Sequence, residues 1–180
     1  MGRFANFAAF QATWFAAVIG AGRGHAGWGV AAVALFAALQ LRMQRTRRAD
    51  LRLLAVAGMA GFALDSALVA TGLLRYAAPW PLAGLAPAWI VALWMGLALT
   101  LNHSLRWLRS RPWLAGALGA LAAPLSYLGA ARGWQAVAFA PPVAGTLAIV
   151  AACWAVMLWA LVSLARRWAR APAPAWLQPA

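Results

Sequence analysis

The stretch GFALDSALVATG (residues 61–72) places a carboxylate, that of Asp65, inside a run of apolar and small residues. It belongs to a longer apolar run over residues 53–74, long enough to cross the ~30 Å hydrocarbon core of a bilayer as a helix. An aspartate at the centre of a spanning helix costs about 2.5–3.5 kcal/mol on insertion scales. Contacts inside a helical bundle can offset this cost, so Asp65 marks the expected interior of the protein.

The composition of the whole chain is that of an integral membrane protein. Of 180 residues, 66% are hydrophobic and 9% are charged, whereas soluble domains are roughly 45–50% apolar and about 25% charged. Lipid offers no partner for backbone polar groups, so each apolar run must be helical. The sequence therefore predicts an all-α, polytopic bundle of six transmembrane helices in one domain (residues 1–170), followed by a Pro/Ala-rich cytoplasmic tail (171–180). The other five runs are 4–21, 26–41, 87–105, 113–131 and 143–164.

Arginines between the runs predict the orientation. All 15 basic residues are Arg, and the net charge is +13. With six spans, twelve arginines fall on the side of both termini, and only Arg23, Arg75 and Arg132 fall on the other. Cytoplasmic segments carry the excess of positive charge, so both termini are expected in the cytoplasm. Arginine used without lysine, beside abundant alanine, suggests a GC-rich bacterial genome, so we expect a multi-pass protein of the bacterial inner membrane.

Two other interpretations of the charged and terminal segments are rejected. Nucleic-acid binding would need a basic face on a folded soluble unit, which the sequence does not provide, so no nucleic acid is expected as a partner. The first apolar run is expected to remain as a span and not to be a cleaved signal peptide, because Asn6 and Gln11 interrupt its apolar region.

Small residues on the face of Asp65 indicate that it points toward another helix. Ala57, Gly61 and Asp65 follow one another at intervals of four residues, a pattern that lets helices approach closely. Counting 1.5 Å per residue from the run ends puts several polar or aromatic side chains at or near its depth. We therefore predict a ligand-binding cluster of Asp65, Trp94, Tyr127 and Ser126, with Gln11 and Asn102 on its cytoplasmic side. The alternative is that Asp65 only joins two helices by hydrogen bonds.

The stretch LTLNHSLRWLRSRP (residues 99–112) contains a second group of candidates. His103, Arg106 and Arg109 are expected at the cytoplasmic interface, where they would contact anionic lipid headgroups. The alternative is that these residues do no more than orient the protein.

The inventory of metal ligands argues against a metal site or other cofactor. The chain has two His, one Cys and two Asp, and a metal centre needs several such ligands to converge. His25 and His103 are expected on opposite sides of the membrane, so they could not hold a heme together. No nucleotide-binding motif is present. No cofactor and no catalytic residue are predicted.

Five short motifs carry a family resemblance: Asn6 and Gln11 with Trp14, then GFALDSALVATG (61–72), PAWIVALW (87–94), LNHSLRWL (101–108) and APLSYLGAARGW (123–134). In this order they resemble a family of small bacterial inner-membrane proteins catalogued only as a domain of unknown function, over about residues 5–165. The resemblance implies members encoded near enzymes similar to cyclopropane-fatty-acid synthases. It implies no catalytic residue, and Ser126 stands where it implies a small apolar residue.

The sequence is compatible with three functions. The leading one is an accessory protein of envelope lipid metabolism that binds a lipid or small molecule, with membrane lipids and a lipid-modifying enzyme as partners. The alternatives are a small transporter in which Asp65 carries a proton, and a membrane-embedded enzyme with Asp65 as general acid or base. An enzyme is the weakest of the three, because one carboxylate has no second catalytic group beside it. The sequence leaves the oligomeric state open.

Overall fold

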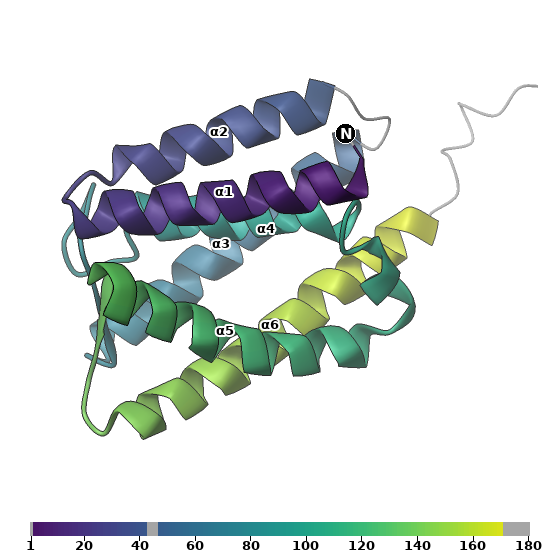
Figure 1. The fold of residues 1–180 in the computed structure, drawn as a ribbon. Coiled ribbons are helices and arrows are strands. Elements are labelled where there is room, and N and C mark those ends of the chain that lie inside the picture. Colours follow the sequence, from purple (N-terminus) through teal and green to yellow (C-terminus); the bar gives the residue numbers. More distant parts are fainter. Residues whose placement is uncertain (1, 43–46, 171–180) are drawn as a thin grey trace, which may run out of the picture.

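Six α-helices form three consecutive antiparallel hairpins, α1–α2, α3–α4 and α5–α6, in the computed structural model of the chain (Figure 1). The structure describes residues 2–42 and 47–170. The predicted tail at 171–180 and Arg45 lie outside the described residues. The helices are α1 (Arg3–Gly22), α2 (Gly27–Arg42), α3 (Arg47–Ala70), α4 (Ala88–Leu101), α5 (Pro112–Trp134) and α6 (Val143–Arg170).

The all-α prediction is confirmed, and the six helices match the six apolar runs in order. In the described part of the chain, α1, α3, α5 and α6 are long and apolar enough to cross a membrane. The other two are shorter apolar helices, since α2 has 16 residues and α4 has 14. At 1.5 Å per residue they measure about 24 and 21 Å, less than the ~30 Å of a bilayer core.

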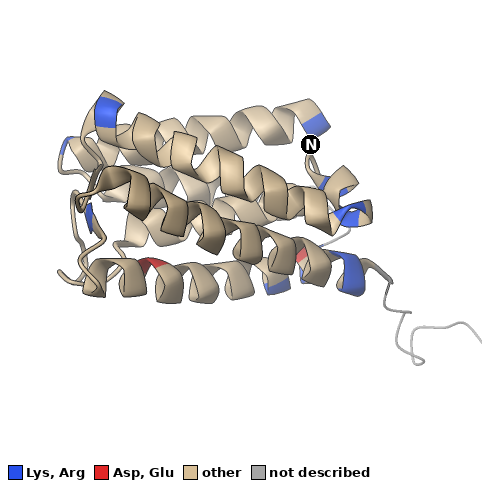
Figure 2. Ribbon diagram, turned by 90° about the horizontal axis from the view of Figure 1, so that it is seen from below, with Lys and Arg blue, Asp and Glu red and all other residues tan. Residues whose placement is uncertain are grey.

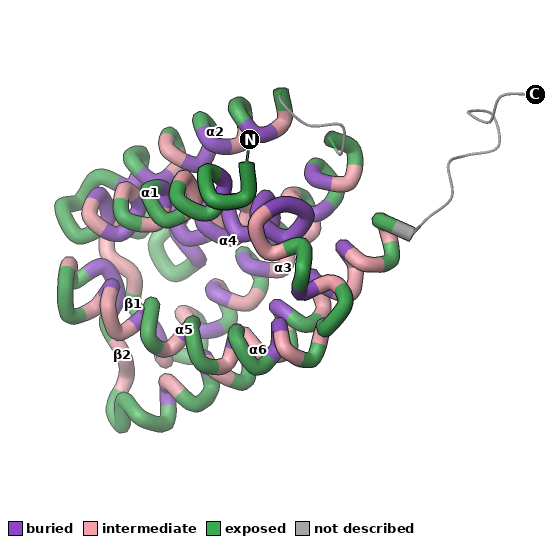
Figure 3. Tube along the Cα trace, turned by 45° about the vertical axis from the view of Figure 1, so that its right-hand side comes forward, coloured by how far each residue is buried: buried purple, intermediate pink, exposed green. Residues whose placement is uncertain are grey.

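The shortest helix, α4, forms the centre of the bundle. It packs against α1, α2 and α3, and eleven of its 14 residues are buried. Its tryptophans Trp89 and Trp94 are among the largest fully buried side chains. A helix that is apolar all round is suited to such a buried position. Figure 3 shows α4 mostly buried, while the outward faces of α1, α2, α5 and α6 are exposed.

The outward faces of the surrounding helices are apolar. Met59, Leu121, Leu125 and Val156 are each between 66% and 69% exposed. A soluble monomer rarely exposes large contiguous apolar patches, so these faces are suited to lipid. The fold therefore has the apolar exterior of a membrane protein around a tightly packed α4.

Several predicted helix boundaries are wrong, among them the end of α6, which was expected at residue 164 and lies at Arg170. The third apolar run was expected at residues 53–74, but α3 begins at Arg47 and ends at Ala70. Asp65 is thus five residues from the end of α3, about 7.5 Å along the axis, and not at its midpoint. The fourth run was expected to stay helical to residue 105, but α4 ends at Leu101 because the next residues turn inward to make polar contacts.

Two connections expected to be simple loops pair with each other. The segment β1 (Leu74–Tyr76) follows α3, and β2 (Val137–Phe139) follows α5. They form an antiparallel two-stranded sheet in which Tyr76 lies opposite Val137. This pairing satisfies backbone groups in both connections and folds β1 back against the end of α3.

The opposite end of the bundle carries the N-terminus, the start of α3 and a 3-10 helix, η1 (Arg106–Ser110). Arginines gather at both ends of the bundle, and more densely at this end (Figure 2). The basic residues therefore form a dense group at one end of the bundle and a sparse group at the other.

Candidate functional site

Asp65 is fully buried and accepts hydrogen bonds from three different elements. The indole N–H of Trp94 in α4 donates to Oδ2 at 2.6 Å. The hydroxyl of Tyr76 in β1 donates to Oδ1 at 2.5 Å, and that of Tyr127 in α5 donates to the same oxygen at 3.0 Å. The two hydroxyl oxygens are 3.3 Å apart. Asp65 therefore ties α3 to α4, α5 and β1 at one point.

Gly61, one helical turn before Asp65, makes this contact between α3 and α4 geometrically feasible. A Cβ at Gly61 would lie 2.2 Å from the ring atoms Cγ and Cδ1 of Trp94. Ala57, a further turn back, is fully buried. The small-residue face predicted from the sequence is thus the face on which α4 packs.

A second tryptophan completes the aromatic surroundings of the carboxylate. Trp154 in α6 stacks on Trp94 with ring centroids 4.0 Å apart and meets Tyr127 edge-on at 6.3 Å. Its indole nitrogen is shielded from solvent and from the cavity. Trp154 therefore contributes its ring to the packed wall of the site, and no accessible donor.

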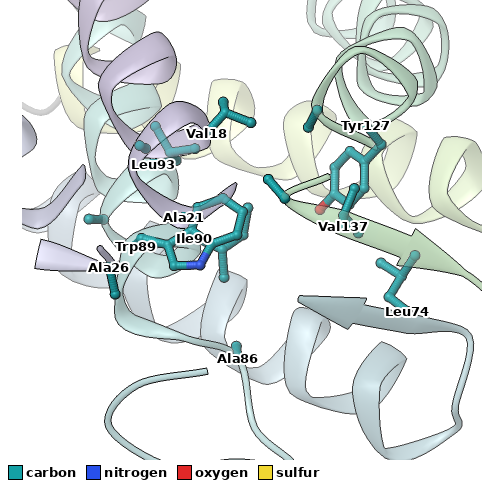
Figure 4. Packing of buried hydrophobic residues seen from close by; sticks show 14 of the residues in the cluster. Val18, Ala21, Ala26, Leu74, Ala86, Trp89, Ile90, Leu93, Tyr127 and Val137 are labelled. Carbon is teal, nitrogen blue, oxygen red and sulfur yellow. The ribbon is translucent and has the colours of Figure 1, made fainter. Parts of the chain in front are cut away.

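These aromatic side chains line a cavity of about 570 Å³. The cavity lies along α1, α4 and α5, with Tyr76 and Val137 of the two strands at one end and Leu105 and Leu108 at the other. Along α5 its lining runs from Leu118 to Ala130, about 18 Å at 1.5 Å per residue. Figure 4 shows Tyr127 and Val137 on one side of this region, and Trp89 and Ile90 of α4 on the other.

The cavity is apolar and opens toward the outside of the bundle. Its described lining contains no charged side chain. Phe7 and Phe15 of α1 and Leu118 and Leu125 of α5 line it, and all four are at least 36% exposed. The opening between α1 and α5 therefore faces the apolar exterior, where acyl chains would surround the protein.

The predicted site residues separate into two groups. Trp94 and Tyr127 contact Asp65 directly and also line the cavity. Gln11 and Ser126 line the same cavity, but they are exposed residues on α1 and α5. They do not join the Asp65 cluster as expected, because their side chains lie at the mouth and not behind it.

Asn102 belongs to a different cluster, at the arginine-rich end. Its amide donates to Oδ1 of Asp50 at 2.8 Å, and its carbonyl oxygen accepts from Arg109 at 3.1 Å. His103 Nε2 lies 3.0 Å from Oδ2 of Asp50. The turn after α4 thus points both side chains inward, and the imidazole expected near lipid headgroups is buried against α3.

Asn6 fastens α1 to the same turn. Its side-chain amide donates to the carbonyl of Leu99 at 3.3 Å, and its oxygen accepts from the hydroxyl of Ser104 at 2.6 Å. Residues from α1, α3, the turn after α4 and η1 therefore meet around the end of α4. This region shapes the boundary between the apolar cavity and the arginine-rich surface.

Five residues of these clusters were not predicted as site residues: Tyr76, Asp50, Trp154, Asn6 and Ser104. The sequence contains one signal for Tyr76, because it is one of only two tyrosines in the chain. In the structure both tyrosines bind the same carboxylate. Asp50 is the second of two acidic residues, but its RRADLR context suggested a solvated loop. It instead lies buried in the first turn of α3, where a carboxylate also suits the helix dipole.

The donor set offers little to a metal ion. Across residues 2–42 and 47–170, no three His, Cys, Asp or Glu side chains are grouped so that they could hold one. The chemistry of the cavity is therefore that of aromatic surfaces, hydroxyls and indole N–H groups.

Comparison with known proteins adds a family. No curated protein and no solved structure matches the chain significantly. One family model matches residues 3–160, which is most of the chain and includes α1 to α5 entirely. The chain belongs to the family described as "Protein of unknown function (DUF2878)".

Proposed function

We propose that the protein is an integral membrane protein that binds the acyl chain of a lipid in the cavity between α1, α4 and α5. The observation that carries this proposal is the apolar opening between α1 and α5. A cavity of about 570 Å³ is within the usual range for small-molecule sites. Its elongated, uncharged lining suits a hydrocarbon chain better than a compact polar ligand.

The polar groups of the lining would fix the ligand at a few points. Gln11 and Ser126 lie on facing helices at the mouth. An ester or carboxyl oxygen on the ligand could accept from these donors. Asp65 itself would not touch the ligand. Its role would be to hold the rings of Trp94 and Tyr127, which line the cavity, in place through hydrogen bonds.

The orientation and the cellular role are proposed from the distribution of arginines and from the family resemblance. The arginine-rich end, which carries the N-terminus and the start of α3, would lie in the cytoplasm, with all six helices in the bacterial inner membrane. The short α2 and α4 would be accommodated beside longer neighbours. The family resemblance supports an accessory role in envelope lipid metabolism, beside a lipid-modifying enzyme.

The transporter and enzyme alternatives receive no specific support. Asp65 does not line the cavity, and each of its oxygens is engaged by a neighbouring side chain. A proton carrier or general acid–base needs access to water or substrate. Lipid binding is therefore the function that the geometry favours.

Filling the cavity should abolish acyl-chain binding. Ala122 lines the cavity but is exposed, so Ala122→Trp can occlude the opening without disturbing the core. We expect cross-linking of a diazirine-tailed phospholipid to cavity residues such as Leu93 to fall about tenfold, equivalent to about 1.4 kcal/mol of binding free energy. Peptide mapping by mass spectrometry measures the yield at each position.

The matched control is Ala117→Trp, on the same helix, exposed and outside the cavity lining. It should leave cavity cross-links unchanged. Cross-links confined to outward-facing residues such as Leu121 and Val156 in the wild-type protein would show that lipid only surrounds the bundle, and would refute the proposal.

A further inference from the structure

A second pocket, of about 260 Å³, lies at the arginine-rich end between η1 and α6. Arg106 and Arg109 of η1 line it together with Arg166 of α6. Residues three apart eclipse one another in a 3-10 helix, so Arg106 and Arg109 share one face of η1. Three guanidinium-bearing side chains thus converge on one small space from two elements.

Among the described residues, no carboxylate contacts these three arginines directly. The chain has only two acids: Asp65 is held by three aromatic donors, and Asp50 receives Asn102 and His103. Three like charges gathered without a counter-charge in direct contact repel one another, and a bound anion would relieve this repulsion.

Two of the three pocket arginines are more constrained than the neighbouring arginines, whereas Arg106 is exposed. Arg109 donates to Asn102, which is itself bound to Asp50, so its guanidinium is positioned from behind. Arg109 and Arg166 are half-buried, whereas Arg111 and Arg167 are exposed. Partial burial and a fixed partner reduce the conformational freedom that an arginine loses when it binds a ligand.

We propose that Arg106, Arg109 and Arg166 form a binding site for a phosphate group. Guanidinium groups bind phosphate through paired, charge-assisted hydrogen bonds. The site lies at the end of the bundle where headgroups of the cytoplasmic leaflet would meet the protein, so an anionic phospholipid is one source of the phosphate and a free phosphate compound is another.

The position of η1 connects this site to the apolar cavity. Leu105 and Leu108, each one residue before a pocket arginine, line the cavity. The two sites therefore share η1 as a wall. One anionic phospholipid could place its phosphate among the arginines and an acyl chain in the cavity; this last step rests on the proposed function, whereas the phosphate site does not.

A charge-matched pair of double variants tests the site. Arg106→Gln/Arg166→Gln removes two arginines from the pocket and leaves Arg109 with its Asn102 contact. Arg111→Gln/Arg167→Gln removes two exposed arginines near the same η1 and α6 segments, outside the pocket. Binding of dioctanoyl phosphatidic acid, dioctanoylglycerol and inorganic phosphate to the full chain in neutral detergent is measured at one fixed ionic strength.

We expect the pocket double variant to bind phosphatidic acid at least about tenfold more weakly, and the exposed double variant to stay within about twofold of wild type. Competition by inorganic phosphate at comparable concentration would identify a free phosphate compound as the source, and its absence would identify a headgroup. Equal losses in both double variants, or equal binding of dioctanoylglycerol, would overturn the proposal.

The cavity variant separates the two proposals. If Ala122→Trp leaves phosphatidic acid binding intact while the pocket double variant abolishes it, the phosphate site stands and acyl binding in the cavity fails. If neither variant changes binding, the phosphate site fails on its own. Unchanged thermal unfolding of each variant shows that the differences arise from binding.

Discussion

Replacing Asp65 with alanine should destabilise the protein strongly. The change leaves the Trp94 indole and one of the two tyrosine hydroxyls as buried donors without an acceptor, since Tyr76 and Tyr127 can still pair with each other. A buried polar group without a partner costs about 1–3 kcal/mol, so the free energy of unfolding should fall by about 3 kcal/mol. For a chain of this size that corresponds to a drop of roughly 6–12 °C in Tm, measured by circular dichroism in detergent.

Asp65→Asn provides the matched control. The asparagine oxygen can accept from the Trp94 indole, which only donates, while its NH₂ donates to the tyrosine hydroxyls, which can also accept. We expect this variant to retain most of the stability that the alanine variant loses. If Asp65→Asn unfolds as readily as Asp65→Ala, the carboxylate has a role that hydrogen bonding to these three side chains does not explain.

The two variants, Asp65→Ala and Asp65→Asn, also distinguish a functional role of the carboxylate from a purely structural one. When Asp65→Asn folds, its binding of acyl chains should be close to that of wild type, because Trp94 and Tyr127 keep their places in the cavity wall. A pH-gradient-dependent flux in vesicles that Asp65→Asn abolishes would instead support the transporter. Such a result would refute the positioning role given to Asp65 here.

The second large effect is expected from Gly61→Ala. A Cβ would lie 2.2 Å from two Trp94 ring atoms, a distance that no packed structure tolerates, so either α3 or the indole must move. Overpacking of this kind costs about 1–3 kcal/mol, and movement of Trp94 would also break its bond to Asp65. Thermal unfolding reports the loss of stability, and near-ultraviolet circular dichroism reports disruption of the Trp94–Trp154 stack.

Gly58→Ala tests the same helix without the same clash. Its Cβ would lie 3.2 Å from Cγ of Met95, a flexible side chain that can yield. Alanine is a better helix former than glycine by about 1 kcal/mol, so Gly58→Ala should be neutral or stabilising. Equal destabilisation by both substitutions would show that the helix backbone, and not the Trp94 contact, responds to the change.

Several features of the fold were predictable because they depend on properties of short segments. Hydropathy located all six helices, with the largest errors where α3 begins at Arg47, where α4 ends at Leu101 and where α6 continues to Arg170. The first two errors have one cause. A hydropathy pattern assigns polar residues at a helix end to a loop or to the membrane interface. Asp50 and Asn102, however, are polar residues that the fold buries against each other.

The core of the Asp65 cluster was predictable from depth and face alone. Counting residues along runs of opposite direction brought Trp94 and Tyr127 to the level of Asp65, and spacing of four residues chose the face of α3. Ser126 lies beside Tyr127 in sequence but about 100° around the helix, which is enough to place it at the cavity mouth. Whether a side chain joins the Asp65 cluster thus depends more on its angular position around the helix axis than on its depth in the bundle.

The sequence by itself determined that the chain is an all-α protein with an apolar exterior, arginines crowded at one end, and a carboxylate facing inward. These properties follow from composition and from periodicity within single helices. Only the tertiary structure decided that Tyr76 reaches Asp65, that His103 binds Asp50, and that a cavity opens between α1 and α5. The physical reason is that such contacts depend on how connections fold back and how far two helices separate. Those quantities are set by the packing of the whole chain and leave no periodic trace in any one segment.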